Sequence, residues 1–181
     1  MKLALIIPCY NERDNIPFIV KRIKDTFSSR NDVEVIFVDN GSTDGSKTVL
    51  ASQLQDIDFI RYVEINENIG YGGGILFGLD AVSDADVYAW THADMQCDPE
   101  DVLTAFDLFS VKENDFYLIK GKRMSRAFLD QMFTFIMQFI ANFVLNIKVN
   151  DINAQPKVFT KSFYENHIKG VAPSDFSLDL F

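Results

Sequence analysis

The sequence contains few cysteines and few basic residues, and both shortages exclude classes of protein. Cysteine occurs twice in 181 residues, at Cys9 and Cys97, so neither a disulfide framework nor a cysteine-rich metal site is expected. We interpret both as small buried side chains near strand ends. Lysine and arginine number 17 against 26 acidic residues, a net charge of -9, which argues against binding of nucleic acid. An acidic protein that binds an anionic ligand needs a metal ion or local basic groups.

Two familiar nucleotide-binding motifs are also missing. A dinucleotide-binding fold carries Gly-x-Gly-x-x-Gly after its first strand, whereas the first apolar run here is followed by Pro8-Cys9-Tyr10-Asn11-Glu12. Glycines 72–74 come much later in the chain and with different spacing. The Gly-Lys-Ser or Gly-Lys-Thr of a P-loop is absent. No cysteine or histidine stands in a pattern that favours a covalent nucleophile.

Long uninterrupted apolar runs are absent as well. Leu3–Ile7 is too short for the core of a signal peptide, so we expect a buried first strand and a cytoplasmic protein. Residues 128–147 are rich in apolar side chains, but a membrane-spanning helix needs about 20 apolar residues, and a polar stripe interrupts them, formed by Asp130, Thr134, Gln138 and Asn142. We expect a helix that packs in the core or in a homo-oligomer, or that docks peripherally on the inner face of a membrane.

The composition is that of a folded globular domain. Hydrophobic residues make up 48% of the chain and charged residues 24%. A domain commonly spans about 100–200 residues, so we expect one domain over residues 1–181. Ser174 or Asp175 would cap a helix that has barely begun at Phe181, which indicates that the natural protein continues.

Apolar runs alternate with amphipathic stretches along the chain. This alternation predicts an α/β fold with a mostly parallel sheet and helices on both faces. The expected strands are Leu3–Ile7, Val33–Val38, Phe59–Val63, Val87–Trp90 and Phe116–Ile119. The expected helices cover residues 16–27, 46–54, 75–82 and 99–109, and a glycine-rich loop over residues 66–74 leads into the third of them.

The strand Val87–Trp90 is followed by three polar residues at alternate positions, His92, Asp94 and Gln96. Alternate residues of an extended chain point to the same side, so these side chains are candidates to bind one cation at the carboxyl end of the strand. The alternative is an ordinary polar turn in which Asp98 and Pro99 begin the next helix.

Polar side chains also follow the first two strands. Tyr10, Asn11 and Glu12 follow the first, and Asp39, Asn40, Ser42 and Asp44 follow the second. The carboxyl ends of parallel strands meet at one edge of a sheet. Carboxylates so close together repel one another unless a cation is present. We therefore predict Mg²⁺ or Mn²⁺ together with a diphosphate, and the imidazole of His92 favours Mn²⁺.

Four short stretches in this order resemble the signatures of inverting family 2 glycosyltransferases of GT-A fold. The stretches are Ile7-Pro8-Cys9-Tyr10-Asn11-Glu12, Val38-Asp39-Asn40-Gly41-Ser42-Thr43-Asp44, Asn68-Ile69-Gly70-Tyr71-Gly72 and His92-Ala93-Asp94-Met95-Gln96. The resemblance covers about the first 125 residues, and four ordered signatures are more specific than one. It is strongest to the branch that contains dolichol-phosphate mannose synthase and enzymes of polysaccharide assembly.

The resemblance implies transfer of a sugar from a nucleoside-diphosphate sugar to a lipid-phosphate or saccharide acceptor. It implies that Glu12 and Asp39 contact the ribose and base, and that Asp94 is the main ligand of a metal also bound by Gln96 and His92. The nucleotide-binding residues implied are Pro8, Tyr10, Glu12, Asp39, Asn40, Gly70, Gly72 and Ala93. The chain departs from the family at two positions, with His92 and Asn40 where acidic residues are usual.

Two further sets of residues are predicted to act on the acceptor. The resemblance suggests that Lys122, Arg123 and Arg126 bind the acceptor or a phosphate; the alternative is a solvated basic turn. Transfer to a hydroxyl needs a general base, for which Asp175 and Asp179 are candidates. Both could instead simply cap and solvate the start of a helix.

Two other functions are alternatives to sugar transfer. The first is a catalytically silent domain that binds nucleotide sugars, which His92 makes plausible. The second is a sugar nucleotidyltransferase, but that class carries a glycine- and arginine-rich loop directly after the first strand, and this chain lacks it.

Overall fold

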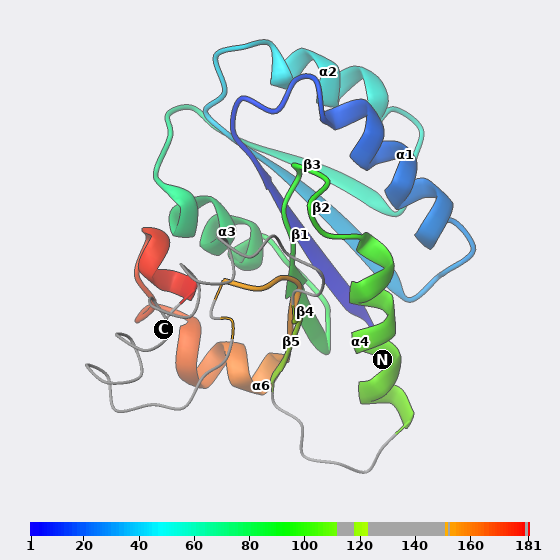
Figure 1. The fold of residues 1–181 in the computed structure, drawn as a ribbon, viewed down its shortest axis with the longest axis vertical. Helices are drawn as coiled ribbons and strands as arrows, with labels where there is room; N and C mark the ends of the chain where they lie inside the picture. The colour runs from blue at the N-terminus through cyan, green and yellow to red at the C-terminus, as the bar shows by residue number, and fades with distance from the viewer. Residues whose placement is uncertain (112–117, 123–150, 152, 180) are drawn as a thin grey trace, which may run out of the picture.

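The computed structural model of the protein describes residues 1–111, 118–122, 151, 153–179 and 181 (Figure 1). The described residues form a six-stranded sheet with the order β3-β2-β1-β4-β6-β5. The strands are β1 (Leu3–Cys9), β2 (Val33–Asn40), β3 (Ile60–Ile65), β4 (Val87–Trp90), β5 (Leu118–Lys120) and β6 (Lys157–Thr160). The first four are parallel in their pairings, and β6 runs antiparallel to both β4 and β5. The predicted helix over residues 128–147 lies outside the described residues.

Helices cover both faces of the sheet, as the sequence predicts. In Figure 1, α1 (Ile16–Phe27), α2 (Ser46–Gln53) and α4 (Pro99–Val111) lie on one side of the sheet. The other side carries α3 (Tyr71–Asp80) and the C-terminal elements. These are α6 (Lys161–Phe163), the π-helical turn η1 (Tyr164–Ile168) and the 3₁₀ turn η2 (Phe176–Asp179).

Strand β1 shows why its apolar run is continuous. Leu5 and Ile7 belong to a core cluster with residues of α1 and α4, whereas Ile6 belongs to a second cluster with Ile75 and Leu79 of α3. A strand that is buried on both faces needs apolar side chains at every position rather than at alternate ones. The parallel register aligns Cys9 with Asp39, so the polar residues after β1 and β2 meet at one edge.

Helix α3 begins earlier than the sequence predicts. The prediction of a loop through residue 74 is wrong, because Gly72, Gly73 and Gly74 already lie within the helix. The glycine farther along this helix has a packing reason. A Cβ at Gly78 would lie 2.5 Å from Cγ2 of Ile6 and 2.8 Å from Cγ2 of Val38. Its missing side chain therefore lets α3 lie directly on β1 and β2.

The end of the sheet also differs from the expectation. Residues 157–160 form β6, which lies between β4 and β5, so the predicted fifth strand occupies the edge of the sheet. Because β6 is antiparallel, its first residue, Lys157, pairs with Trp90 of β4 and with Lys120 of β5. Lys157 therefore lies at the carboxyl edge of the parallel strands.

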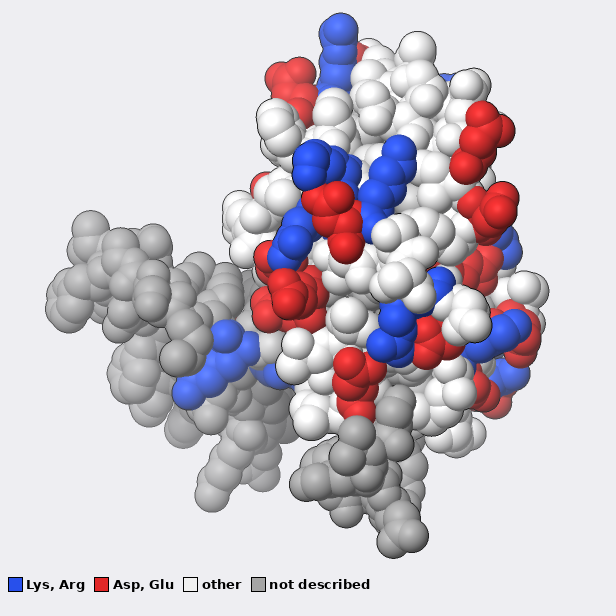
Figure 2. All heavy atoms as spheres, turned by 90° about the vertical axis from the view of Figure 1, so that its right-hand side faces the viewer, with Lys and Arg blue, Asp and Glu red and all other residues white. Residues whose placement is uncertain are grey.

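Charged side chains of both signs are interspersed on the face that carries α1 and α4 (Figure 2). Ion pairs in this part of the chain include Lys21 with Asp25 within α1 and Arg30 with Asp32 just after it. Neither sign forms a continuous patch on the part of this face that the structure describes. Among the described residues, we find no helix with the length and apolar character needed to cross a bilayer.

Candidate functional site

A cavity of about 130 Å³ opens at the carboxyl edge of β1, β2 and β4. Most of its walls come from the ends of three strands that are far apart in the sequence. Its lining residues are Pro8, Cys9, Tyr10, Glu12, Asn40, Tyr71, His92, Ala93 and Asp94. All of them except Cys9 and Tyr71 are residues that the sequence predicts for nucleotide or metal binding. We call this cavity the strand-end pocket.

The loops after β1 and β2 are joined by bonds between side chains and backbone. The Oδ1 atom of Asn11 accepts a hydrogen bond from the Thr43 N–H at 2.8 Å, and Ser42 Oγ accepts one from the Asn11 N–H at 3.0 Å. Asn11 adopts a positive φ of 56°, which asparagine tolerates better than most residues. The buried Ser46 hydroxyl accepts the Glu12 N–H at 2.9 Å. These bonds hold the backbone that carries Glu12.

The carboxylate of Glu12 has a defined position at the pocket. Asn15 Nδ2 donates a hydrogen bond to its Oε2 atom at 2.7 Å. Asp39, predicted beside Glu12 as a contact of ribose and base, is 1% exposed and does not line the pocket. Its Oδ1 atom accepts the N–H of Ser42 at 3.1 Å. In this structure Asp39 therefore holds the turn after β2.

Asn40 has a structural reason to be an amide where an acidic residue is usual. Its Oδ1 atom accepts the Ile69 N–H at 3.1 Å, and its Nδ2 atom donates to the carbonyl of Gly70 at 2.9 Å. A carboxylate at this position could accept the first bond but could not donate the second. Asn40 therefore lines the pocket and also holds the segment that leads into α3.

Tyr71, the first residue of α3, lies between two other aromatic rings. Its ring stacks on the imidazole of His92, with centroids 5.7 Å apart, and on Phe176 at 5.0 Å. Its hydroxyl lies 3.4 Å from Asp179 Oδ2 and 3.4 Å from Gln155 Nε2. Burial raises the pKa of Tyr71, and the negative charge of Asp179 adds to this shift, so the phenol stays protonated. The sequence contained a signal for Tyr71, because it sits between two glycines of a family signature.

Gly70 and Gly72 do not line the pocket. Instead the backbone of residues 173–175 lies against them. A Cβ at Gly72 would come within 2.7 Å of the carbonyl oxygens of both Pro173 and Asp175. The neighbouring N–H of Gly73 donates to the carbonyl of Ser174 at 2.7 Å. The glycine-rich start of α3 thus holds the C-terminal segment, which we define as residues 173–179.

The two candidate bases occupy different environments. Asp175 is exposed and caps η2, accepting bonds from the Ser177 N–H at 2.8 Å and from its hydroxyl at 2.5 Å. These bonds lower the pKa of Asp175. Asp179, with a side chain 9% exposed, forms an ion pair with Lys157, whose side chain is 7% exposed. Burial lowers the pKa of Lys157, while its acidic partner opposes that shift.

The chain after β4 does not remain extended through the predicted metal-binding residues. Met95 has a positive φ of 63°, and Asp94 Oδ1 accepts the N–H of Gln96 at 3.0 Å. Gln96 is exposed and does not line the pocket, because the chain is not extended between Asp94 and Gln96, and its role as a metal ligand stays a prediction. Within the described residues no group of three or more His, Cys, Asp or Glu side chains is arranged to hold a metal.

His92 and Asp94 nevertheless line one cavity. An imidazole nitrogen and a carboxylate suit Mn²⁺, and Mg²⁺ commonly takes one or two carboxylates with its remaining ligands from phosphates and water. The donors at the strand-end pocket therefore fit a divalent ion that arrives with a diphosphate.

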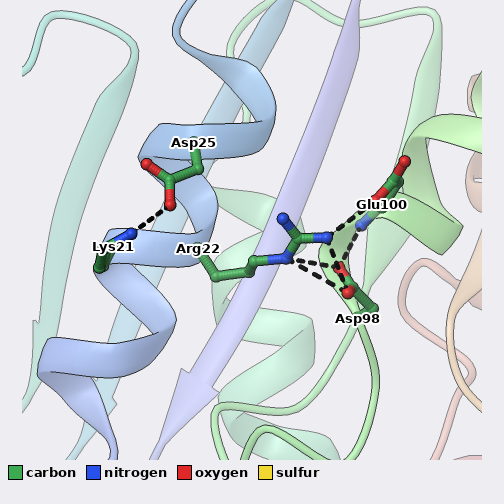
Figure 3. A network of polar contacts seen from close by, with 5 residues as sticks. All are labelled: Lys21, Arg22, Asp25, Asp98 and Glu100. Carbon is green, nitrogen blue, oxygen red and sulfur yellow. Dashed lines mark hydrogen bonds and ion pairs between the residues drawn. The ribbon is translucent and has the colours of Figure 1, made fainter.

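Helix α4 begins directly after this segment, as the alternative sequence interpretation predicted for Asp98 and Pro99. Asp98 Oδ1 accepts the N–H of Glu100 at 2.9 Å and so caps the helix. Figure 3 shows Arg22 of α1 reaching across to both carboxylates. Its Nη2 atom lies 2.8 Å from Asp98 and 2.8 Å from Glu100. The Arg22 guanidinium lowers the pKa of Asp98. This contact ties the start of α4 to α1.

Of the three basic residues predicted to bind the acceptor, Lys122 is described by the structure and is exposed just after β5. Because β4 and β5 are both antiparallel to β6, Lys122 follows the same edge of the sheet as the pocket. Arg123 and Arg126 lie outside the described residues.

The fold and the pocket define an α/β protein of the GT-A type, with a ligand site at the carboxyl edge of its parallel strands. The chain belongs to glycosyl transferase family 2, whose model matches residues 4–166.

Curated relatives share part of the chain. It is 30% identical over 128 residues to the undecaprenyl-phosphate 4-deoxy-4-formamido-L-arabinose transferase of Proteus mirabilis (strain HI4320), an alignment that covers 69% of this chain and 38% of the relative. The protein of the same name from Pseudomonas fluorescens (strain Pf0-1) is 32% identical over 103 residues, covering 55% of this chain and 30% of the relative. The chain thus spans less than half the length of these relatives.

Solved structures with the same fold include the mannosyltransferase PcManGT from Pyrobaculum calidifontis in complex with GDP-Man and Mn²⁺. It superposes with a TM-score of 0.72 at 20% identity, covering 98% of this chain and 49% of that one. Glucosyl-3-phosphoglycerate synthase from Mycobacterium tuberculosis, in complex with Mn²⁺, UDP and glucosyl-3-phosphoglycerate, superposes with a TM-score of 0.66 at 16% identity, covering 90% of this chain and 57% of that one. At these identities the likeness shows the fold alone, and it confirms the GT-A expectation.

Proposed function

We propose that residues 1–181 are a catalytic domain that transfers a sugar, with inversion, from a nucleoside-diphosphate sugar to a lipid-phosphate or saccharide acceptor. The observation that carries the proposal is the strand-end pocket, which gathers Glu12, Asn40, His92 and Asp94 from separate strand ends. The membership of glycosyl transferase family 2 supports the reaction type. The names of the curated relatives support a lipid-phosphate acceptor.

In this proposal Asp94 and His92 hold a divalent ion, Mg²⁺ or Mn²⁺. Bound there, the ion would neutralise the diphosphate that leaves the sugar. The Mn²⁺ in the complexes of two structural relatives supports the choice of metal. Glu12, oriented by Asn15, binds the nucleoside end of the donor, and Tyr10, Pro8 and Ala93 complete the walls of the pocket.

The acceptor approaches from the side of β5 and the C-terminal segment. Lys122, with Arg123 and Arg126, is proposed to attract its negative charge. An acceptor that is a membrane lipid would place the protein at the inner face of a membrane, on its cytoplasmic side. If the acceptor is a hydroxyl, a base must take its proton, and Asp179 lies one hydrogen bond from Tyr71 of the pocket.

A thermal-shift panel with UDP, GDP and TDP, each with and without Mn²⁺, tests the donor site. We expect one nucleotide to raise the melting temperature in the presence of Mn²⁺, because a ligand at 100 times its Kd stabilises a fold by about 2.7 kcal/mol. Asp94→Ala should remove the part of the shift that depends on Mn²⁺. Asp101→Ala, at an exposed position of α4, is the matched control and should keep it. If no nucleotide stabilises the wild-type protein, the proposal is wrong.

One observation favours a second function, a catalytically silent domain that binds nucleotide sugars. His92 stands where the family usually has an acidic residue. Its ring stacks on Tyr71 and also lines the pocket. Under this alternative the thermal shift would persist, but neither transfer nor hydrolysis of the nucleotide sugar would be detected by chromatography of the released nucleotide.

A further inference from the structure

The ion pair between Lys157 and Asp179 joins two elements that lie outside the four signature stretches. Lys157 is the first residue of β6, and Asp179 is the last residue of η2. Both side chains are nearly fully buried. Burying two charges costs free energy that their attraction often fails to recover, so a buried pair is weak evidence for a role in stability. Its position beside the pocket suggests a role in chemistry instead.

The two oxygens of the Asp179 carboxylate have different surroundings. Oδ1 receives the ammonium of Lys157 and lies 3.4 Å from Gln155 Nε2. Oδ2 lies 3.4 Å from the hydroxyl of Tyr71, which is long for an O–H···O hydrogen bond. Each carboxylate oxygen can accept about two hydrogen bonds. Oδ2 therefore keeps the capacity to accept a proton, while Oδ1 is held by the cation.

Tyr71 connects this carboxylate to the pocket. Its ring lines the pocket and stacks on His92, and its hydroxyl lies within reach of Asp179. Among the described residues, the charged and titratable side chains that contact Asp179 are Lys157 from β6 and Tyr71 from α3. His92 lies across the Tyr71 ring, and Asp94 contributes its charge to the same tyrosine. Lys157 is the cation in this set, and it also lies over the Trp90 ring at 5.4 Å from the centroid.

We propose that Lys157 is a positioning residue for sugar transfer to a hydroxyl: it holds Asp179 as an ionised carboxylate beside Tyr71, ready to accept the proton of the nucleophile. This inference rests on the proposed function and concerns transfer to a hydroxyl, because an ionised phosphate acceptor needs no base. The acceptor O–H bond breaks and its proton passes to Asp179 Oδ2. The acceptor oxygen bonds to C1 of the sugar, and the C1–O bond to the diphosphate breaks, with its electron pair leaving on the diphosphate.

Removing the opposite charge from a buried carboxylate makes it bind protons more tightly, commonly by tenfold or more. Hydrolysis of the nucleotide sugar supplies a simple readout, since water is the hydroxyl nucleophile and the natural acceptor is not required. The substrate is GDP-mannose, UDP-GlcNAc or a TDP-sugar, chosen by the nucleotide that gives the thermal shift. In Lys157→Met we expect the acid limb of the plot of kcat against pH to move to higher pH by about one unit or more, with KM nearly unchanged. Lys157→Arg should restore the wild-type limb.

A second readout is independent of turnover. With ¹³C-labelled aspartate, the carboxyl signal of Asp179 is assigned by its loss in Asp179→Asn and followed during a pH titration. Its midpoint should move to higher pH in Lys157→Met and return in Lys157→Arg. Lys2→Met is the matched control, because it removes an exposed ion pair with Asp84 far from the pocket and should leave the midpoint unchanged. If Lys157→Met does not fold, Lys157→Gln takes its place.

The outcomes separate the two proposals. The inference is overturned if the midpoint of the Asp179 titration is unchanged in the Lys157 variant. It is also overturned if that midpoint moves while the acid limb of the kcat–pH profile does not. Full hydrolysis by Asp179→Asn also overturns it, because a different group must then take the proton. A wild-type protein that binds no nucleotide contradicts the proposed function instead, and the NMR titration still reports on the ion pair.

Discussion

The two sides of the strand-end pocket are built in different ways. On the side of β1 and β2, exposed loops are joined by short bonds between polar side chains and nearby backbone, as in the contacts of Asn11 and Ser46. On the side of β4 and β6, the C-terminal segment is held by a buried ion pair, stacked rings and close approach to glycine. The first side joins the stretches that follow β1 and β2, through contacts between residues 32 and 34 positions apart, and the second side joins the C-terminal segment to α3 and β6.

The second side also carries polar atoms that are buried without a hydrogen-bond partner. Within the described residues these include Trp90 Nε1, Thr91 Oγ1 and Gln155 Oε1. Such a group costs about 1–3 kcal/mol when it loses its partner. The donor side is thus stabilised by hydrogen bonds between its two loops, whereas the opposite side is stabilised by a buried ion pair and stacked rings next to the pocket. Four substitutions test this contrast, in order of decreasing effect.

The largest effect is expected for Gly72→Ala. The added methyl group would meet two backbone carbonyl oxygens of the C-terminal segment, and overpacking of this kind costs about 1–3 kcal/mol. We expect a loss near the upper end, about 3 kcal/mol, in urea unfolding, and faster hydrogen exchange in residues 173–179. Gly73→Ala is the control, because its Cβ would meet the movable side chain of Ile69. Equal losses in both variants would show that the C-terminal segment is not held in this way.

The next effect concerns Asn40, whose amide joins the pocket to the start of α3. Asn40→Asp keeps the acceptor but loses the donor to Gly70 and places a carboxylate against that carbonyl. We expect a loss of about 2 kcal/mol in the free energy of unfolding. Asn68→Asp should cost far less, because Asn68 acts as an acceptor for the Gly70 N–H at 2.7 Å, and a carboxylate still accepts. A harmless Asn40→Asp would contradict the explanation given for this amide.

A smaller effect is expected on the donor side from Ser46→Ala. The Ser46 hydroxyl accepts the Glu12 N–H and donates to Asp44 Oδ1 at 2.6 Å. Losing these bonds should cost about 1 kcal/mol and weaken nucleotide binding, since the backbone of Glu12 loses its support. Ser52→Ala removes an exposed hydroxyl and should change neither quantity. If the Ser46 variant binds nucleotide as tightly as wild type, the loop contact does not organise the donor side.

The smallest effect belongs to the contact in Figure 3 between Arg22 and Asp98. The folded protein lowers the pKa of Asp98, so the contribution is complete above the unfolded value of about 3.9 and is lost as pH falls through the folded value. Both side chains are partly exposed, so solvent screening keeps the contribution small. Unfolding free energies of wild type and Arg22→Gln should differ slightly at pH 7 and converge as the pH falls below the folded pKa of Asp98. Lys21→Gln, which loses an exposed pair within α1, is the control.

The sequence predicted the parallel half of the fold because β1 and β2 are apolar at nearly every position and turn-forming residues follow each one. It predicted most of the pocket for a related reason, since the residues after parallel strands must share an edge. Strand β6 escaped prediction because four residues carry little periodicity and its pairing with β4 is long-range. Tyr71 stood in a signature, but its contact with Gln155, 84 positions away, could not be seen in the sequence, and Lys157 lies in no signature. The position of Gln96 outside the pocket lining was not foreseen, because the turn at Met95 breaks the assumed extended chain.

The antiparallel direction of β6 determines which of its two connecting segments can contribute residues to the ligand site. In a parallel strand, the residues that leave the strand reach the ligand, and the residues that enter it lie at the opposite edge. In β6 the order is inverted, so the entering segment lies at the same edge of the sheet as the pocket, with Gln155 beside Tyr71 and Asp179. Insertions or substitutions just before Lys157 should therefore alter substrate specificity. Changes just after Thr160 should leave the catalytic activity unchanged and affect only the stability of the fold.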